Sequence, residues 1–138
     1  MSAPSSGQEG ETMLYAILCY HEEDVVWSWS AEQEAAVMTR LAEVQAPMIA
    51  SGKMGPSLRL MPTTTATTLR KTKDAPLVID GPFAETKEQL LGFYVVEVAD
   101  LEEALAIARD LAAANPGGAY ELRPVALYNP DQRPGLAP

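Results

Sequence analysis

The sequence has one cysteine and one histidine among its 138 residues, so few side chains are available for nucleophilic or proton-transfer chemistry. The lone cysteine, Cys19, cannot form an internal disulfide. No apolar run approaches the roughly 20 residues of a membrane-spanning helix. No basic start followed by an apolar run marks a secretory signal. We therefore expect a soluble, cytoplasmic protein.

Positive charge is also scarce, with 10 Lys plus Arg against 19 Asp plus Glu and a net charge of -9. Such a charge repels phosphate groups, so neither nucleic acid nor a membrane surface is an expected partner. The chain also lacks a glycine-rich phosphate loop, a paired metal-ligand spacing and a serine nucleophile motif. We expect no cofactor and no metal.

What is present is the composition of one packed domain, with 47% apolar and 21% charged residues. A chain of this size buries roughly two thirds of the surface that it exposes when unfolded. We place the domain at residues 13–128. Residues 1–12, rich in Ser, Gly, Pro and Glu, predict a disordered tail, and residues 129–138 form a Pro-rich C-terminal tail.

Two helices are predicted by cap residues followed by apolar stripes. Ser30 with Gln33 three positions later is a capping-box pattern that starts a helix at Ala31. Its stripe comprises Val37, Leu41, Val44 and Met48. Pro47 should distort the last turn, and Gly52 offers a left-handed stop. Asp100 caps a second helix, which the motif NPGG ends.

The remaining segments have β character. Residues 13–20, MLYAILCY, suit a central strand, and residues 53–80 hold two or three short extended pieces. LLGFYVVEV is the strongest strand signal, and residues 120–127 supply the last strand. This order predicts an α+β fold, a ferredoxin-like antiparallel sheet with two helices on one face. Because the other face needs a cover, we expect a homodimer whose sheets pack together.

The run DGPFAETKEQLLGFYVVEVADLEEAL, residues 80–105, resembles the signature of the DGPF branch of the YCII-related family. TTTATTLRK, LYAILCY and ELRPV fit the same pattern in the same order, so the resemblance spans roughly Met13 to Val125. It implies a dimeric α/β barrel of ferredoxin-like units. Because many members carry a His and Asp pair, the resemblance also implies enzymatic activity, and one relative is a dehydrochlorinase acting on a chlorinated hydroxyquinol. Members are often encoded beside extracytoplasmic-function sigma factors.

The family's His commonly sits on the first helix, where this sequence has Leu41. A leucine cannot take up or donate a proton. The candidate catalytic residues are therefore Asp80, from the signature, and His21, the one imidazole, at the end of the first strand. The alternative for Asp80 is a turn residue in Asp-Gly-Pro, and for His21 a solvated loop residue beside acidic neighbours.

Four residues are candidates for ligand binding: Trp27, Phe83, Lys87 and Tyr94. Aromatic side chains could stack on a planar ligand, or could serve only core or dimer packing. Lys87 could hold an anionic group, or could pair with Glu85 or Glu88. Phe93 and Tyr94 should point to opposite faces of their strand, and Cys19 should share a face with His21. A buried Cys19 that acts only as a small apolar residue is the simpler interpretation.

Together these features predict a protein that binds a small organic ligand. Its catalytic form would be cofactor-independent acid-base chemistry, such as elimination or isomerisation, with Asp80 and His21 as proton carriers. The alternative is a non-catalytic ligand sensor or a regulatory interaction partner, linked to an extracytoplasmic-function sigma factor.

Overall fold

The computed structural model describes residues 11–132, 134 and 135, so most of the predicted N-terminal tail lies outside the described residues. The helices are α1 (Glu23–Val26), α2 (Ala31–Ala50) and α3 (Leu101–Ala114), with a short 3-10 turn at Thr63–Thr65. The strands are β1 (Met13–His21), β2 (Met54–Arg59), β3 (Thr67–Arg70), β4 (Leu77–Asp80), β5 (Gln89–Val98) and β6 (Ala119–Pro124).

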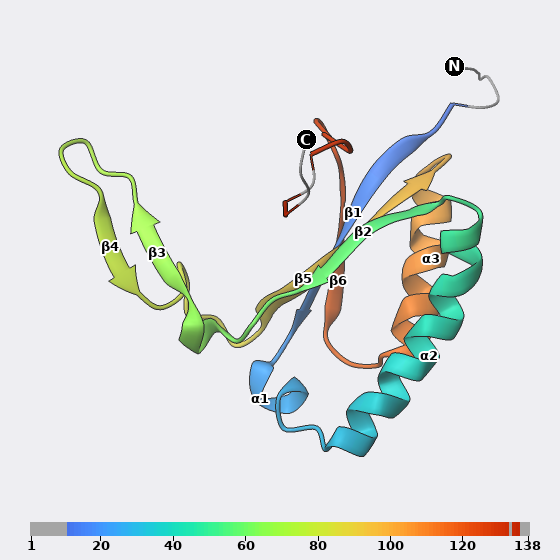
Figure 1. The fold of residues 1–138 in the computed structure, drawn as a ribbon, viewed down its shortest axis with the longest axis horizontal. Coiled ribbons are helices and arrows are strands. Elements are labelled where there is room, and N and C mark those ends of the chain that lie inside the picture. The colour runs from blue at the N-terminus through green and yellow to red at the C-terminus, as the bar shows by residue number, and fades with distance from the viewer. Residues whose placement is uncertain (1–10, 133, 136–138) are drawn as a thin grey trace.

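Four strands form one antiparallel sheet in the order β2-β5-β1-β6. Helices α2 and α3 both cover one face of this sheet (Figure 1). Strand β1, which was predicted to be central, and β5, which has the strongest strand signal, both lie at the centre of the sheet. This arrangement confirms the predicted ferredoxin-like α+β fold.

Local sequence signals set the ends of the helices. Ser30 Oγ accepts from the Gln33 backbone N–H, and Gln33 Oε1 accepts from the Ser30 N–H, so the capping box is present. Helix α2 continues through Pro47 to Ala50, and Gly52 follows with a φ of 77°. The proline lies in the last turn, so it removes one backbone donor without ending the helix. Asp100 caps α3 as predicted, by accepting from the Glu103 N–H.

The core lies between the two helices and the sheet. Its least exposed large side chains are Ile17 of β1, Val96 and Val98 of β5, and Leu111 of α3. Val37 and Leu41 of α2 belong to the same cluster. Nearer to α1, the two layers leave space that the core does not fill, and this space is the site described below.

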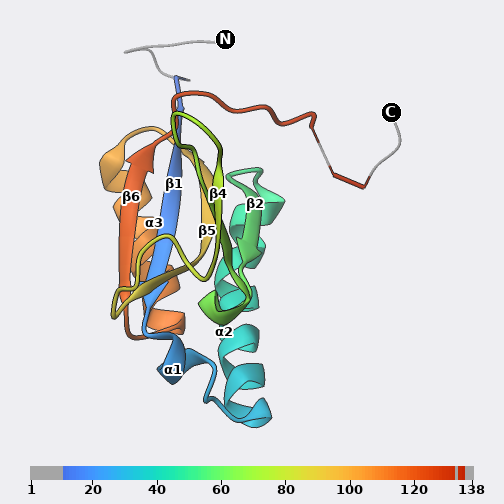
Figure 2. The same ribbon diagram turned by 90° about the vertical axis from the view of Figure 1, so that its left-hand side faces the viewer.

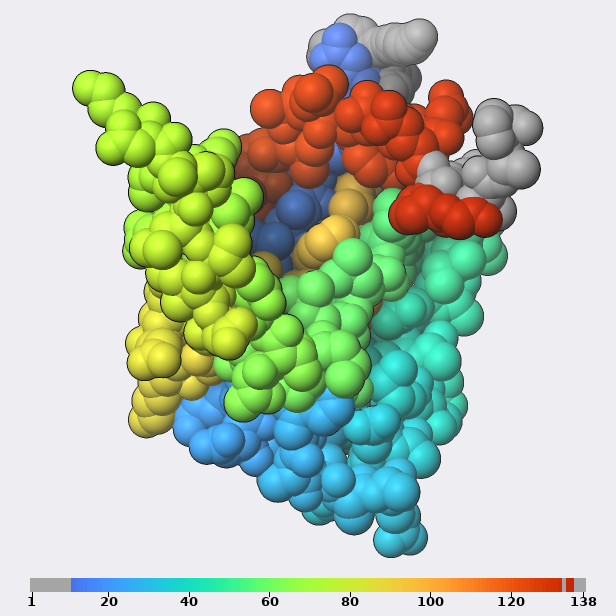
Figure 3. Space-filling view, turned by 60° about the vertical axis from the view of Figure 1, so that its left-hand side comes forward, coloured from blue at the N-terminus to red at the C-terminus, as the bar shows by residue number. Residues whose placement is uncertain are grey.

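Among the residues that the structure describes, strands β3 and β4 pair only with each other and form a hairpin separate from the main sheet. Figure 2 shows the hairpin on the side of the sheet opposite the helices. The space-filling view shows a hollow over β1 and β5, framed by the hairpin, β2 and the segment after β6 (Figure 3). That a second copy of the chain covers the sheet face opposite the helices stays a prediction.

The last strand, β6, ends at Pro124, earlier than the predicted residue 127. The short helix α1 was not predicted.

Candidate functional site

A cavity of about 290 Å³ lies between α2 and the helix-facing side of the sheet. One side, which we call the apolar wall, comprises Val26, Trp29, Val37, Met38 and Leu41. The opposite side, which we call the polar wall, comprises Cys19, His21, Tyr94, Asn115 and Tyr120. A concave, mainly apolar space with a few converging polar groups is typical of small-molecule sites.

The pleat of the sheet places the polar wall. Side chains alternate along β1, so Cys19 and His21 both face the cavity, as predicted. Cys19 pairs in register with Gly92 of β5 and with Tyr120 of β6. Gly92 has no side chain, and a Cβ there would collide with the carbonyl oxygen of Leu58 on β2. The missing side chain therefore lets β2 lie close to β5 at the cavity.

His21 is held between its own backbone and the loop that joins α3 to β6. The backbone N–H of Glu22 donates to His21 Nδ1 over 2.7 Å. Because a backbone N–H can only donate, Nδ1 carries no proton and the neutral ring has its proton on Nε2. A Cβ on Gly117, whose φ is 98°, would lie 2.7 Å from His21 Nε2. The two glycines of NPGG thus permit a close approach to the ring that no other residue type allows.

The thiol and phenol groups of the polar wall stay protonated at neutral pH. Burial raises the pKa of Cys19 to about 12, so this residue is a neutral thiol and not an activated nucleophile. Burial, followed by the proximity of Cys19, raises the pKa of Tyr94. Burial also raises the pKa of Tyr120, against a smaller opposing effect of the neighbouring Asn115 side chain. These groups offer hydrogen bonds without negative charge.

Two atoms of the polar wall are buried without a hydrogen-bond partner among the described residues: Asn115 Oδ1 and the Tyr120 hydroxyl oxygen. The two side chains are neighbours. Asn115 follows the last turn of α3, and Tyr120 stands on β6. Since buried polar atoms are nearly always paired, these two atoms are available to an ordered water or to a bound molecule.

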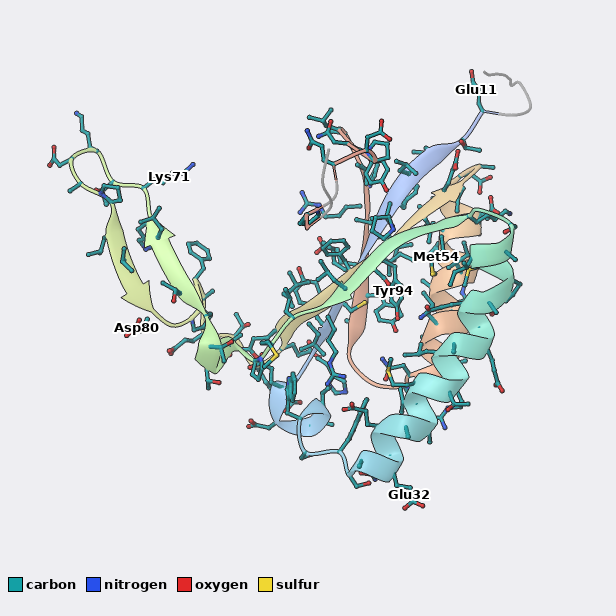
Figure 4. All side chains as sticks on the ribbon, in the orientation of Figure 1. Glu11, Glu32, Met54, Lys71, Asp80 and Tyr94 are labelled. Atoms are coloured by element: carbon teal, nitrogen blue, oxygen red, sulfur yellow. The ribbon has the colours of Figure 1, made fainter. Side chains whose placement is uncertain are left out.

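Two of the predicted site residues line the cavity, His21 and Tyr94. Figure 4 shows Tyr94 within the body of the domain and Asp80 on the projecting hairpin. Asp80 is exposed at the end of β4 and does not line the cavity. Within one protomer the fold does not bring Asp80 and His21 to the same cavity, and their pairing stays a prediction.

The other three predicted ligand-binding residues lie at the surface. Phe83 is 73% exposed, with the Arg70 guanidinium 5.0 Å from its ring centre. The Lys87 side chain is 82% exposed, and its Nζ lies 3.9 Å from Glu22 Oε2. Trp27 is exposed beneath the Arg59 guanidinium, whereas its neighbour Trp29 lines the cavity. Ligand contact by these three residues stays a prediction.

Sequence reasoning missed Asn115, Gly117 and Tyr120, which all line the cavity. The motif NPGG indicated only the end of a helix, because its contact with His21 depends on pairing between β1 and β6. Leu41, at the position where the resemblance puts a His, also lines the cavity. His21 therefore faces the same space from the sheet that Leu41 faces from the helix.

Within the described ranges 11–132 and 134–135, no three His, Cys, Asp or Glu side chains gather in a way that could hold a metal ion. In that same part of the chain, no helix is long and apolar enough to cross a membrane.

Comparison with known proteins agrees with the family resemblance of the sequence. The family model of the YCII-related domain matches residues 13–129. A protein of Rhizobium meliloti (strain 1021), "Uncharacterized protein R00369", is 55% identical over 123 residues, which cover 88% of this chain and 99% of that protein. The match spans β1 to β6, so the cavity falls inside the matched region.

Proposed function

Because the chain belongs to the YCII-related domain family, we propose that it binds a small organic molecule in the cavity between α2 and the sheet. The observation that carries this proposal is the pairing of an apolar wall with a polar wall across one cavity. The volume of about 290 Å³ equals that of roughly ten water molecules at about 30 Å³ each. A molecule the size of a single substituted ring fits this space.

The catalytic form of this function is acid-base chemistry without a cofactor, such as an elimination or an isomerisation. His21 is the proton carrier, because imidazole is the side chain that ordinarily gains and loses a proton near neutral pH. Its ring faces the cavity in a fixed orientation. Asp80 is the second proton carrier in this form. Because Asp80 does not line the cavity of its own protomer, it must approach His21 from outside that cavity.

The second candidate is a non-catalytic ligand sensor or regulatory interaction partner, coupled to an extracytoplasmic-function sigma factor. It is favoured by one observation: no carboxylate is among the described residues that line the cavity. Without a carboxylate beside the imidazole, the cavity offers recognition more readily than proton transfer.

A thermal-shift screen of small metabolites tests the shared claim of binding. A ligand present at 100 times its dissociation constant adds about 2.7 kcal/mol of stability. Leu41→Phe, which fills the cavity, should abolish the shift, whereas Ala42→Phe on the exposed side of α2 should retain it. Equal shifts in both variants would place the ligand outside the cavity.

Turnover separates the two candidates once a ligand is found. In the catalytic form, His21→Gln and Asp80→Asn each reduce the rate by about 10²-fold or more, the range of general acid-base catalysis. In the sensor form, the ligand binds but is not transformed. Unchanged rates in both variants would end the assignment of these residues as proton carriers.

A further inference from the structure

We infer that the polar wall recognises an uncharged head group that both donates and accepts hydrogen bonds, such as a primary amide, and that it rejects carboxylates. This inference rests on the proposed binding in the cavity and specifies the chemistry of the ligand. It follows from three features of the wall, namely an acceptor, a donor and the placement of charge.

The acceptor is Asn115 Oδ1, which is buried and has no partner among the described residues. A carbonyl oxygen can only accept, so the group that satisfies it must bring an N–H or an O–H. A carboxylate brings neither at neutral pH. The first requirement on the ligand is therefore a donor.

The donor is the hydroxyl of Tyr120, whose oxygen is also buried and unpartnered among the described residues. Burial raises the pKa of this phenol, so its proton is present at neutral pH and is available to an acceptor on the ligand. Tyr120 stands on β6 and Asn115 at the end of α3, so separate elements of the fold hold the two groups. The second requirement is an acceptor adjacent to the donor, which a primary amide provides.

The placement of charge decides between neutral and anionic ligands. Of the described residues that line the cavity, Arg59 alone carries a permanent charge. Its guanidinium lies over the Trp27 ring at 4.6 Å and 3.6 Å from Glu34 Oε1. A carboxylate placed against Asn115 and Tyr120 would be desolvated beside an acceptor, without a cation on the polar wall to offset the cost.

Four probes of similar size test the inference on the full chain: benzamide, N,N-dimethylbenzamide, benzoate and toluene. Toluene tests only the apolar cavity, and the other three differ in the head group. Dissociation constants come from NMR titration, with the methyl groups of Val37 and Leu41, which line the cavity, as the reporters. We expect benzamide to bind at least about tenfold more tightly than each of the other three probes.

A matched pair of variants separates recognition from simple packing. Asn115→Leu should weaken benzamide about tenfold and leave toluene unchanged, whereas the exposed Asn129→Leu should change neither. If toluene binds but the two amides and the acid bind equally, the inference is wrong and the proposed binding stands. If benzoate binds best, the inference is wrong. If no probe perturbs the cavity residues, both the inference and the proposed binding fail.

Discussion

The catalytic form of the proposed function depends on His21, and Gly117 packs closely against the imidazole ring of this residue. Gly117 lies against Nε2 while the Glu22 N–H bonds to Nδ1, so the ring is constrained on both nitrogens. The identity of the one imidazole could be read from the sequence. Its partner could not, because the contact joins residues 21 and 117 through the pairing of β1 with β6.

Gly117→Ala should displace the His21 ring. The added Cβ would lie 2.7 Å from Nε2, a distance that real contacts essentially never show. Because the chain has one histidine, its imidazole NMR signals report the change without ambiguity. We expect altered ¹⁵N shifts of the ring and loss of the Nε2–H tautomer preference.

Gly52→Ala is the matched control for this prediction. Gly52 also has a positive φ, 77°, but no atom of the described residues lies within 4 Å of the point that an added Cβ would occupy. Both variants carry the strain of a left-handed residue, about 1–2 kcal/mol. If both variants shift the His21 signals equally, Gly117 has no positioning role.

Cys19 is the second residue whose environment the structure defines. Its pKa is raised from 9.0 to about 12 by burial, so the unfolded chain loses this proton at a lower pH than the folded chain. The contribution of this neutral thiol to stability is complete below about pH 9 and is lost between about pH 9 and 12. The fold therefore disfavours the thiolate at neutral pH.

We predict slow alkylation of Cys19 by iodoacetamide. At pH 8 its thiolate fraction is about a thousandfold smaller than that of a free thiol of pKa 9.0. The same protein unfolded in urea should react at the rate of a model thiol. Rapid labelling of the folded chain at pH 8 would show that Cys19 is activated.

At the scale of elements, helices and central strands could be predicted more completely than the cavity. Ser30 with Gln33 and the Asp100 cap are local signals, and both form the predicted contacts. The polar wall is assembled from β1, β5, β6 and the end of α3, so no short stretch of sequence contains its pattern. Tyr94 could be predicted because neighbouring side chains such as Phe93 and Tyr94 point to opposite faces of a strand, whereas the sequence around Tyr120 predicts only a strand.

Gly92→Ala tests how β2 and β5 enclose the cavity. The new methyl group would collide with the Leu58 carbonyl oxygen, a backbone atom that cannot move alone. We expect a loss of about 1–3 kcal/mol in the free energy of unfolding, measured by urea denaturation. Gly55→Ala on β2, where the nearest atom would be 3.4 Å away, should cost clearly less. Equal losses would contradict the close approach at Gly92.

At the scale of the whole molecule, two apolar surfaces lie on the side away from the helices. The first is the open face of the sheet, where Leu58 pairs with Phe93 and Phe93 with Leu18. The second is the β3–β4 hairpin, whose Leu69 and Val78 are 57% and 65% exposed. A two-stranded hairpin alone is marginally stable in water, so it gains from a partner.

We therefore predict a homodimer that covers both surfaces. Sedimentation at micromolar concentration should give twice the mass of one chain. Leu58→Asp should produce monomers, because it places a charge on the open sheet face. Ile49→Asp, at a similarly exposed apolar position on α2, should leave the dimer intact. Sedimentation of the wild-type chain as a monomer would contradict the prediction.

The central claim, that a small molecule occupies the cavity between α2 and the sheet, is tested most directly by a methyl-NMR titration of the full chain with toluene. Val37 and Leu41 line the cavity, and Leu127 is exposed outside it. The account predicts saturable shifts of the Val37 and Leu41 methyl groups and unchanged Leu127 signals. Saturating toluene that leaves Val37 and Leu41 unmoved would contradict it.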